Sequence, residues 1–182
     1  GERAACNADD MKRLCEEYGM ECAVIEKLYD GGEAISSTRI RAAAAEGDME
    51  TVRRLCGYPF CIENTVVAGE HLGREYGLPT INQGFGGGYV IPKYGVYVSA
   101  AYVDGKFYPA VTNVGVRPTL HDDRGVTVEP WLLDFHGDLY GQTIRVEFYR
   151  RLRGEKRFAS LDELRAEILR NAEETRAYFA QT

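Results

Sequence analysis

This sequence lacks long apolar runs, a recognisable secretory signal and a metal-ligand pattern. No segment approaches the roughly 20 apolar residues that a helix needs to cross a bilayer, and no stretch has the features of a secretory leader. The three histidines, His71, His121 and His136, do not show the spacing of a metal site. The five cysteines are an odd number and include no C-x-x-C pair, which favours idle thiols in a reducing compartment over a disulfide framework. We therefore expect a cytoplasmic protein that has no membrane partner.

The charge balance also lacks an excess of basic residues. The 182 residues include 22 lysines and arginines against 28 aspartates and glutamates, for a formal net charge of −6. An acidic chain without a basic stripe argues against a nucleic-acid partner. A nucleotide can still be bound, because this needs only a local cluster of donors. The length allows one substantial domain, or one domain and a fragment.

The first forty residues are too few for a complete domain. Residues 8–18 have the spacing of an amphipathic helix. Residues 21–26 predict a short strand that follows this helix closely. The chain also begins with Gly1 rather than methionine. We therefore expect this region to be the remnant of an α/β domain.

Two short helices are expected next. The Ser-Ser-Thr segment at residues 36–38 can cap a helix whose body is the alanine run 42–45 and which Gly47 closes. A further helix is expected over residues 48–56. Two explanations of the Ser-Ser-Thr segment stay open. It is either a simple helix cap, which is favoured, or a phosphate site where N–H groups, hydroxyls and two arginines converge.

From residue 60 onward the pattern changes to short alternating strands with glycine-rich turns. Asp104-Gly105 is a strong hairpin signal between two of these strands. Several antiparallel strands without intervening helices predict a mainly β fold, a small barrel or sandwich. The expected strands cover residues 61–67, 95–103, 106–113, 126–135 and 143–152.

The chain closes with a predicted amphipathic helix. Ser160 and Glu163 form a capping box, with serine at the N-cap and glutamate three residues later. An apolar stripe at helical spacing follows. We expect this helix to pack on the barrel or to cover an opening. The stripe consists of Leu161, Leu164, Ile168 and Ala172.

The most unusual stretch is Gly-Leu-Pro-Thr-Ile-Asn at residues 77–82. Glycines spaced four residues apart precede it and allow the backbone to approach a ligand closely. Thr80 and Asn82 lie two residues apart, so an extended segment places their oxygen-bearing side chains on the same side. Such oxygens suit Mg²⁺, especially when the ion is shared with phosphates. Spacing alone also allows a plain glycine turn that leads into a strand.

Glu129 is a second candidate, because it interrupts an otherwise apolar strand. A buried carboxylate is unfavourable unless it is paired or used. Pro130 beside it cannot donate to a strand ladder, which predicts an edge or a bulge. An ordinary glutamate at a strand edge facing water explains the same pattern about as well.

Taken together, these segments resemble the riboflavin kinase family over residues 58–180. The stretch at residues 69–82 resembles the family's glycine-rich loop and P-T-A-N signature, and further motifs follow in the family's order. Residues 35–41 also resemble the closing motif of the adenylyltransferase domain in bacterial two-domain FAD synthetases. The further motifs are Pro92-x-x-Gly95-Val96-Tyr97, Asn113 to Thr119, Glu129-x-x-Leu132-Leu133-Asp134-Phe135, Asp138-Leu139-Tyr140-Gly141 and Leu152-Arg153-x-Glu155-Lys156-x-Phe158-x-Ser160-Leu161.

The resemblance implies a six-stranded antiparallel barrel of the riboflavin kinase type with a C-terminal helix, preceded by a small α/β remnant. Residues 1–57 would be the end of the adenylyltransferase domain, and residues 58–182 would be the riboflavin kinase domain. The implied reaction transfers the γ-phosphate of ATP to the 5′-hydroxyl of riboflavin, giving FMN and ADP. The chain would make FMN but not FAD. The resemblance implies no particular oligomeric state.

The resemblance also implies roles for individual residues. Thr80 and Asn82 would hold Mg²⁺ and the nucleotide phosphates. Glu129 would be the base that takes the hydroxyl proton, and Arg153 would face the flavin or its new phosphate. The nucleotide loop would consist of Gly69, Gly73, Arg74, Gly77 and Pro79, and Arg117 would belong to a mobile flap.

Three departures from the family pattern leave these roles in place. Ile81 replaces a small residue, Trp131 stands where histidine is common, and Gly154 replaces a proline. The alternative function is a flavin- or nucleotide-binding barrel without catalysis, which the presence of Thr80, Asn82 and Glu129 disfavours. An oligonucleotide-binding barrel is disfavoured by the acidic charge.

Overall fold

The computed structural model describes residues 6–67, 80–85, 88–116 and 125–181. The chain divides into two compact units, Gly1–Ile35 and Ser36–Thr182, which are described separately. In the described part of the chain, no helix has the length and apolar character needed to cross a membrane.

The described residues of the first unit, 6–35, contain one helix and one small hairpin. Helix α1 (Ala8–Glu17) begins at Asn7, whose side chain accepts hydrogen bonds from the backbone N–H groups of Asp9 and Asp10 at 2.9 and 3.1 Å. The hairpin consists of β1 (Tyr29–Asp30) and β2 (Glu33–Ala34). The helix confirms the prediction for residues 8–18, and none of its residues is buried.

The strand predicted over residues 21–26 is wrong. These residues have no regular secondary structure. Residues 22–25 form a short apolar run, but a strand also needs a neighbour for its backbone hydrogen bonds. Ile25, at the centre of the segment, is 91% exposed, so the apolar side chains do not cover a sheet in this unit.

The second unit begins with two short helices, as predicted. Helix α2 (Ser37–Glu46) is capped by Ser36, whose hydroxyl accepts the N–H of Arg39 at 3.2 Å. Helix α3 (Met49–Cys56) follows directly. Gly47 ends α2 with φ of 78°, a left-handed conformation that favours glycine. A Cβ atom at Gly47 would lie 2.7 Å from the Arg151 side chain, so the close approach of α2 to the barrel also requires glycine.

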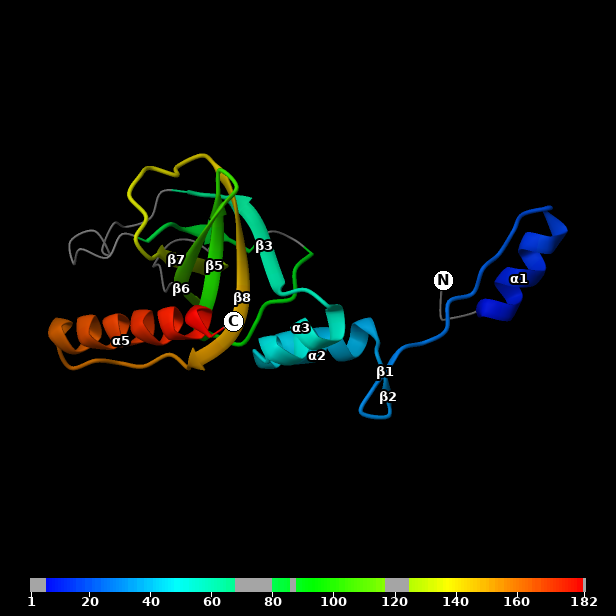
Figure 1. Cartoon of the computed structure of the whole chain (residues 1–182), viewed down its shortest axis with the longest axis horizontal. Helices are drawn as coiled ribbons and strands as arrows, with labels where there is room; N and C mark the ends of the chain where they lie inside the picture. Colours follow the sequence, from blue (N-terminus) through cyan, green and yellow to red (C-terminus); the bar gives the residue numbers. More distant parts are fainter. Residues whose placement is uncertain (1–5, 68–79, 86–87, 117–124, 182) are drawn as a thin grey trace. The chain divides into compact units, whose positions relative to one another are not determined.

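The body of this unit is a six-stranded antiparallel, nearly closed barrel (Figure 1). Its strands are arranged in the order β3-β8-β5-β6-β7-β4. The β5–β6 hairpin turns at Asp104 and Gly105, both with positive φ, which confirms the Asp-Gly prediction. The strands are β3 (Phe60–Thr65), β4 (Gln83–Gly84), β5 (Gly95–Val103), β6 (Lys106–Val116), β7 (Val126–Leu132) and β8 (Thr143–Arg153).

The two end strands of the sheet, β3 and β4, meet through a mixture of side-chain and backbone bonds. The Asn64 side chain donates to the carbonyl of Gly84 at 2.7 Å, and the Gln83 side chain donates to the carbonyl of Asn64 at 2.7 Å. Just beyond the strands, the N–H of Val67 donates to the carbonyl of Asn82 at 2.8 Å. These bonds bring the barrel close to closure and leave little free sheet edge.

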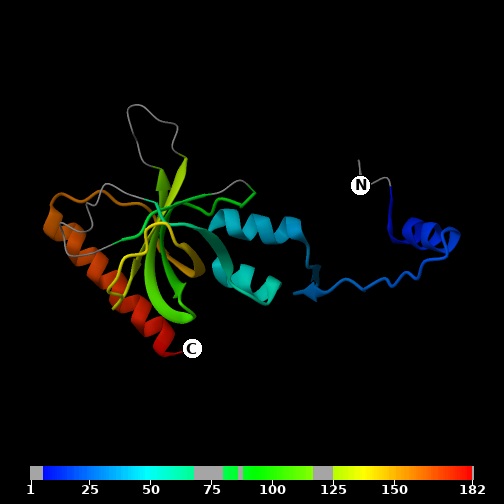
Figure 2. The same cartoon turned by 90° about the horizontal axis from the view of Figure 1, so that it is seen from above.

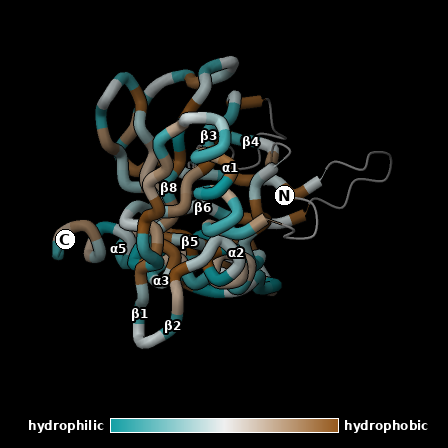
Figure 3. Tube along the Cα trace, turned by 90° about the vertical axis from the view of Figure 1, so that its right-hand side faces the viewer, coloured by the Kyte–Doolittle hydropathy of each residue, from teal (hydrophilic) through white to brown (hydrophobic). Residues whose placement is uncertain are grey.

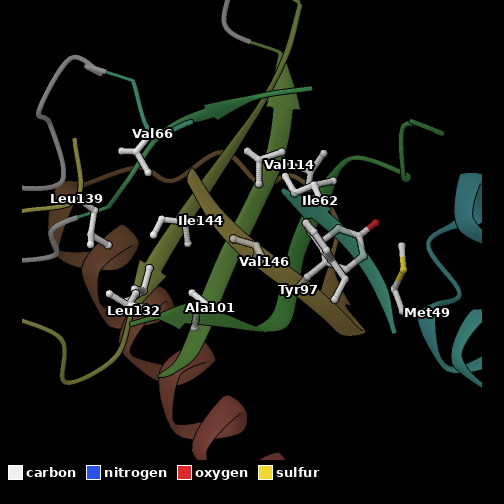
Figure 4. Close-up of a cluster of buried hydrophobic side chains, with 14 of the residues drawn as sticks. Met49, Ile62, Val66, Tyr97, Ala101, Val114, Leu132, Leu139, Ile144 and Val146 are labelled. Carbon is white, nitrogen blue, oxygen red and sulfur yellow. The ribbon is translucent and has the colours of Figure 1, made fainter. Parts of the chain in front are cut away.

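The barrel interior holds the main hydrophobic core (Figure 4). Val146, Ile62 and Val114 are fully buried there, and Met49 from α3 packs beside Tyr97 at one end of the cluster. Figure 3 colours the chain by hydropathy. Strand β5 carries no charged residue, whereas β8 alternates between apolar and charged residues over residues 144–148. The reason is that β5 is buried on both faces, because its outer side chains pack toward α5.

Helix α5 (Leu161–Ala180) runs along the outside of β5 and β6, which confirms the prediction that it packs on the barrel (Figure 2). Ser160 caps the helix by accepting the N–H of Glu163 at 3.2 Å, as predicted. The Glu163 carboxylate reaches back to the N–H of Ala159 at 3.0 Å. At the other end, Phe179 stacks edge-on against Phe107 and Tyr149, with ring centroids 5.0 Å apart in both pairs. These contacts fix the helix against the sheet.

The hydroxyl of Tyr97 lies at the junction between the barrel and α2, where it donates to the carbonyl of Lys93. Burial raises the pKa of Tyr97 to about 12. An unfolded tyrosine ionises near pH 10. The folded state is therefore stabilised relative to the unfolded state below pH 10, and this contribution is lost as the pH rises toward about 12.

We expect the free energy of unfolding to fall between about pH 10 and pH 12, because the unfolded chain releases the Tyr97 proton first. Urea titrations across this range measure the effect, and Tyr97→Phe should reduce the slope. Tyr149 has a raised pKa from burial and from its hydrogen bond to Glu147, so it contributes in the same direction. An equal slope in wild type and Tyr97→Phe would contradict the assignment to Tyr97.

Candidate active site

A cavity of about 550 Å³ lies between the outer face of the barrel and helix α5. Strands β5, β6, β7 and β8 each contribute side chains to its walls, as does the segment between β8 and α5. Most of the wall is apolar, and Val96, Trp131 and Phe158 are among its larger surfaces. A concave, largely apolar cavity with a few polar groups is the usual form of a small-molecule site.

Glu129 projects into this cavity because of the alternation along β7. Val128 and Leu132 point into the barrel and are buried, whereas Glu129 and Trp131 point outward and are half-buried. Asn113 on β6 is the direct neighbour of Glu129 across the strand pair and lines the same cavity. The carboxylate therefore lies at a cavity wall beside a second polar side chain.

Pro130 is tolerated in strand β7 because its backbone nitrogen and carbonyl face away from β6. Its carbonyl accepts the N–H of Ile81 at 2.9 Å. The N and O atoms of one strand residue point to the same side, so the missing N–H of Pro130 also faces this sparsely paired side and not β6. The edge or bulge predicted beside Glu129 is not found, because β7 has neighbours on both sides and its pairing with β6 keeps one register.

The segment at residues 80–82 also alternates. Ile81 packs against the core cluster inside the barrel, so the branched side chain points away from its two polar neighbours, as expected. Thr80 forms a bridge with Trp131 and lines the cavity. Asn82 forms a bridge with Val67 and is only 7% exposed.

Thr80 and Asn82 are suitable in type as ligands of Mg²⁺, which takes oxygen donors. In the described part of the chain, no group of three or more His, Cys, Asp and Glu side chains could hold a metal ion. A metal at this site would thus depend on hydroxyl and amide oxygens together with phosphates of a bound nucleotide. Thr80 lines the cavity, whereas Asn82 is not among the described residues that line it.

Arg153, at the end of β8, lines the cavity wall near α5. Its Nε atom donates to Oδ1 of Asn171 at 3.1 Å, and Oε1 of Glu167 lies 3.3 Å from the same nitrogen. The guanidinium also lies over the Phe158 ring, 5.6 Å from its centroid. Burial lowers the pKa of Arg153 from its usual value, although the Glu167 carboxylate acts in the opposite direction.

A second cavity of about 220 Å³ lies beside Thr80 and Ile81. The turn after β7 supplies its other wall, which includes the polar side chains of His136, Asp138 and Tyr140. Thr80 lines both cavities. The hydroxyl of Thr80 therefore lies in a segment shared by a large apolar cavity and a smaller, more polar one.

The structure brings together three of the predicted site residues, because Thr80, Glu129 and Arg153 all line the larger cavity. Asn82 lies two residues from Thr80 on the segment that leads into β4. The other predicted residues lie outside the described residues. They are Gly69, Gly73, Arg74, Gly77, Pro79 and Arg117.

Sequence reasoning assigned no role to several residues that line the larger cavity. Asn171 is the clearest case, since it is a polar residue in register with Leu164 and Ile168 on α5 and is 1% exposed. A polar residue at this helical spacing is a readable signal of a polar contact beneath the helix. Part of the apolar stripe of α5 also lines the cavity instead of filling the core. The cavity residues without a predicted role include Asn113, Trp131, Glu155, Lys156, Phe158 and Asn171.

Comparisons with known proteins bear on the family and the fold of this chain. The family model described as "Flavokinase: Riboflavin kinase" matches residues 56–179. The bifunctional riboflavin kinase/FMN adenylyltransferase of Bacillus subtilis is 37% identical over 161 residues, which is 87% of this chain and 51% of that protein. The protein of the same name from Escherichia coli K12 is 41% identical over 167 residues, which is 91% of this chain and 53% of that protein. The chain thus spans about half the length of the curated relatives it matches.

Solved structures show the same fold. A Streptococcus pneumoniae protein named as a macrolide-efflux protein has a TM-score of 0.82 at 32% identity, covering 94% of this chain and 55% of that one. The riboflavin kinase of Trypanosoma brucei has a TM-score of 0.51 at 25% identity, covering 68% of this chain and 81% of that one. The barrel, the helix α5 and the family match together show that this chain belongs to the riboflavin kinase family.

Proposed function

We propose that this chain is a riboflavin kinase, which transfers the γ-phosphate of ATP to the 5′-hydroxyl of riboflavin and yields FMN and ADP. The observation that carries the proposal is the convergence of Thr80, Glu129 and Arg153 on one cavity. These three side chains offer an oxygen ligand, a carboxylate and a cation. Phosphoryl transfer needs groups of this kind, because it depends on positioning and on neutralising charge.

The larger cavity is the proposed flavin site. Its volume of about 550 Å³ suits a molecule of this size, and its apolar walls suit a flat aromatic ring system. Trp131 and Phe158 offer aromatic surface, and Leu164 and Ile168 of α5 close the opposite side. The ribityl chain would then reach toward the polar groups around Glu129.

The nucleotide is proposed to approach from the side of Thr80, near the smaller and more polar cavity. Thr80 and Asn82 would hold Mg²⁺, and when bound this ion neutralises charge on the phosphate oxygens of ATP. The Thr80 hydroxyl lies in a segment anchored to Pro130, so it sits near the strand that carries Glu129. This arrangement supports an approach of the two substrates to each other at β7.

Glu129 is the proposed catalytic base. Its carboxylate accepts the proton of the riboflavin 5′-hydroxyl as that oxygen attacks the γ-phosphorus. The new bond joins the flavin oxygen to phosphorus, while the bond from phosphorus to the β–γ bridging oxygen breaks and ADP leaves. Arg153, at the same cavity wall, offers a fixed cation to an oxygen of the flavin substrate.

The activity of the whole protein is a wider proposal. Relatives of twice this length are named bifunctional riboflavin kinase/FMN adenylyltransferase. We propose that residues 1–57 are the end of an adenylyltransferase domain and that residues 58–182 form the kinase domain. The proposed compartment is the cytoplasm, where the odd set of five cysteines would stay reduced.

The direct test is FMN formation by the purified chain with riboflavin, ATP and Mg²⁺, followed by chromatography of the flavin products. We expect FMN and ADP in equal amounts, and a loss of product when a chelator removes the metal. No FMN at high enzyme concentration would contradict the proposal. Tight flavin binding without phosphorylation would instead support the alternative of a non-catalytic flavin-binding barrel.

A further inference from the structure

Two buried polar side chains on helix α5 point toward Arg153. Glu167 and Asn171 are four residues apart and therefore share one face of the helix. Their exposed fractions are 9% and 1%. Buried polar groups are unfavourable unless they are paired, and both groups contact the same Arg153 nitrogen.

These contacts fix the orientation of the Arg153 guanidinium. Nε donates to Asn171 at 3.1 Å and lies 3.3 Å from the Glu167 carboxylate, and Nη1 donates to the carbonyl of Gly154 at 3.2 Å. The planar group is thereby held at two of its three nitrogens. The third, Nη2, has no hydrogen-bond partner in the part of the chain that the structure describes, and the residue lines the cavity.

Glu167 is itself held in place. Its Oε1 atom accepts from Nη2 of Arg170 at 2.6 Å, and Nε of Arg170 also lies 3.6 Å from the Glu174 carboxylate. The carboxylate that faces Arg153 therefore has little freedom to turn away. Asn171 has even less freedom, because it is almost fully buried at the cavity wall.

We propose that Asn171 and Glu167 are positioning residues for the flavin substrate, which act by holding Arg153 so that its Nη2 group meets an oxygen atom of bound riboflavin. This inference rests on the proposed riboflavin kinase function. A side chain that is already oriented loses less conformational freedom on binding, so the ordered arginine strengthens substrate affinity. Neither α5 residue touches the reacting atoms.

A double-mutant cycle tests the inference in the full 182-residue chain. Asn171→Leu removes the acceptor at similar volume, and Arg153→Met removes the guanidinium. We expect Asn171→Leu to raise the riboflavin dissociation constant about ten-fold, with the KM for ATP changed by less than about two-fold. In the Arg153→Met background, Asn171→Leu should have no further effect, because its partner is absent. Quenching of riboflavin fluorescence measures binding independently of turnover.

Two further variants separate positioning from stability. Asn171→Asp keeps an acceptor oxygen and should retain most of the riboflavin affinity. Glu173→Gln breaks a comparable ion pair, to Arg176 at 3.2 Å, on the exposed face of the same helix and should leave affinity unchanged. If Asn171→Leu fails to fold by circular dichroism, Glu167→Gln takes its place in the cycle.

The possible results separate a failure of the positioning role from a failure of the proposed function. An unchanged riboflavin affinity in Asn171→Leu, or an equal loss with and without Arg153, would overturn the positioning role while wild type still makes FMN. A wild-type chain that neither binds riboflavin nor makes FMN would overturn the proposed function and this inference together.

Discussion

Replacement of Glu129 by glutamine is expected to lower kcat by about 10² to 10⁴-fold, the usual contribution of a positioned general base. Glutamine has nearly the same shape but cannot accept the hydroxyl proton. Because the side chain lies at the wall of a cavity whose apolar surface would hold the flavin, binding should depend little on its charge. We therefore expect the riboflavin dissociation constant to stay within about three-fold of wild type.

The measurement is steady-state FMN formation, with riboflavin binding followed separately by fluorescence. Glu63→Gln is the matched control, since Glu63 is an exposed carboxylate on strand β3. It undergoes the same acid-to-amide change and should keep normal turnover. A Glu129→Gln enzyme that retains kcat within ten-fold of wild type would rule out the base assignment.

Replacement of Gly95 by alanine is expected to destabilise the protein by about 3 kcal/mol, from backbone strain and from overpacking together. Gly95 has φ of 145°, and a Cβ atom there would lie 2.2 Å from the carbonyl oxygen of Arg153. This neighbour is backbone, so it cannot rotate away as a flexible side chain would. The β5–β8 pairing must shift, and the shift would displace Arg153 at the cavity wall.

Urea unfolding gives the stability loss, and Gly105→Ala separates its two causes. Gly105 also has a positive φ, of 74°, but a Cβ atom there would meet no atom within 4 Å. It should therefore lose only the conformational part, about 1 kcal/mol. If Gly95→Ala proved no less stable than Gly105→Ala, the close contact with Arg153 would have no energetic importance.

Much of the fold follows from local signals that the sequence states directly. Ser36 and Ser160 cap helices where the pattern predicts caps, and Asp104-Gly105 turns the hairpin. Strand β4 is the exception, because Gln83 and Gly84 become a strand only through partners distant in the sequence. The wrong strand at residues 21–26 has the opposite cause: its apolar run is real, but the described part of the structure offers it no neighbouring strand.

Some residues of the candidate site could likewise be predicted from local sequence patterns, and others could not. Glu129 is recognisable because a charge interrupts an apolar strand, and the position of Thr80 relative to Ile81 follows from simple alternation. The role predicted for Arg153 came from the family resemblance alone. Asn171 was missed because its significance depends on its contact with Arg153 at the end of β8, which helical periodicity does not specify. The cavity forms between a helix and a sheet that are separate in the sequence. Only the apolar stripe of α5 along its wall follows a local sequence pattern.

The junction of β3 and β4 has a consequence for how the enzyme would respond to its substrates. It relies on the Asn64 and Gln83 side chains, whereas a pair such as β5–β6 has a continuous ladder, so it should be the first part of the barrel to open and close in solution. Asn82, a proposed Mg²⁺ ligand, supplies the carbonyl that receives the Val67 N–H at this junction. Opening would thus separate the proposed nucleotide-binding segment from the barrel, and binding of Mg–ATP there would favour the closed form by mass action. The nucleotide would then stabilise the closed β3–β4 junction as well as donate the phosphate.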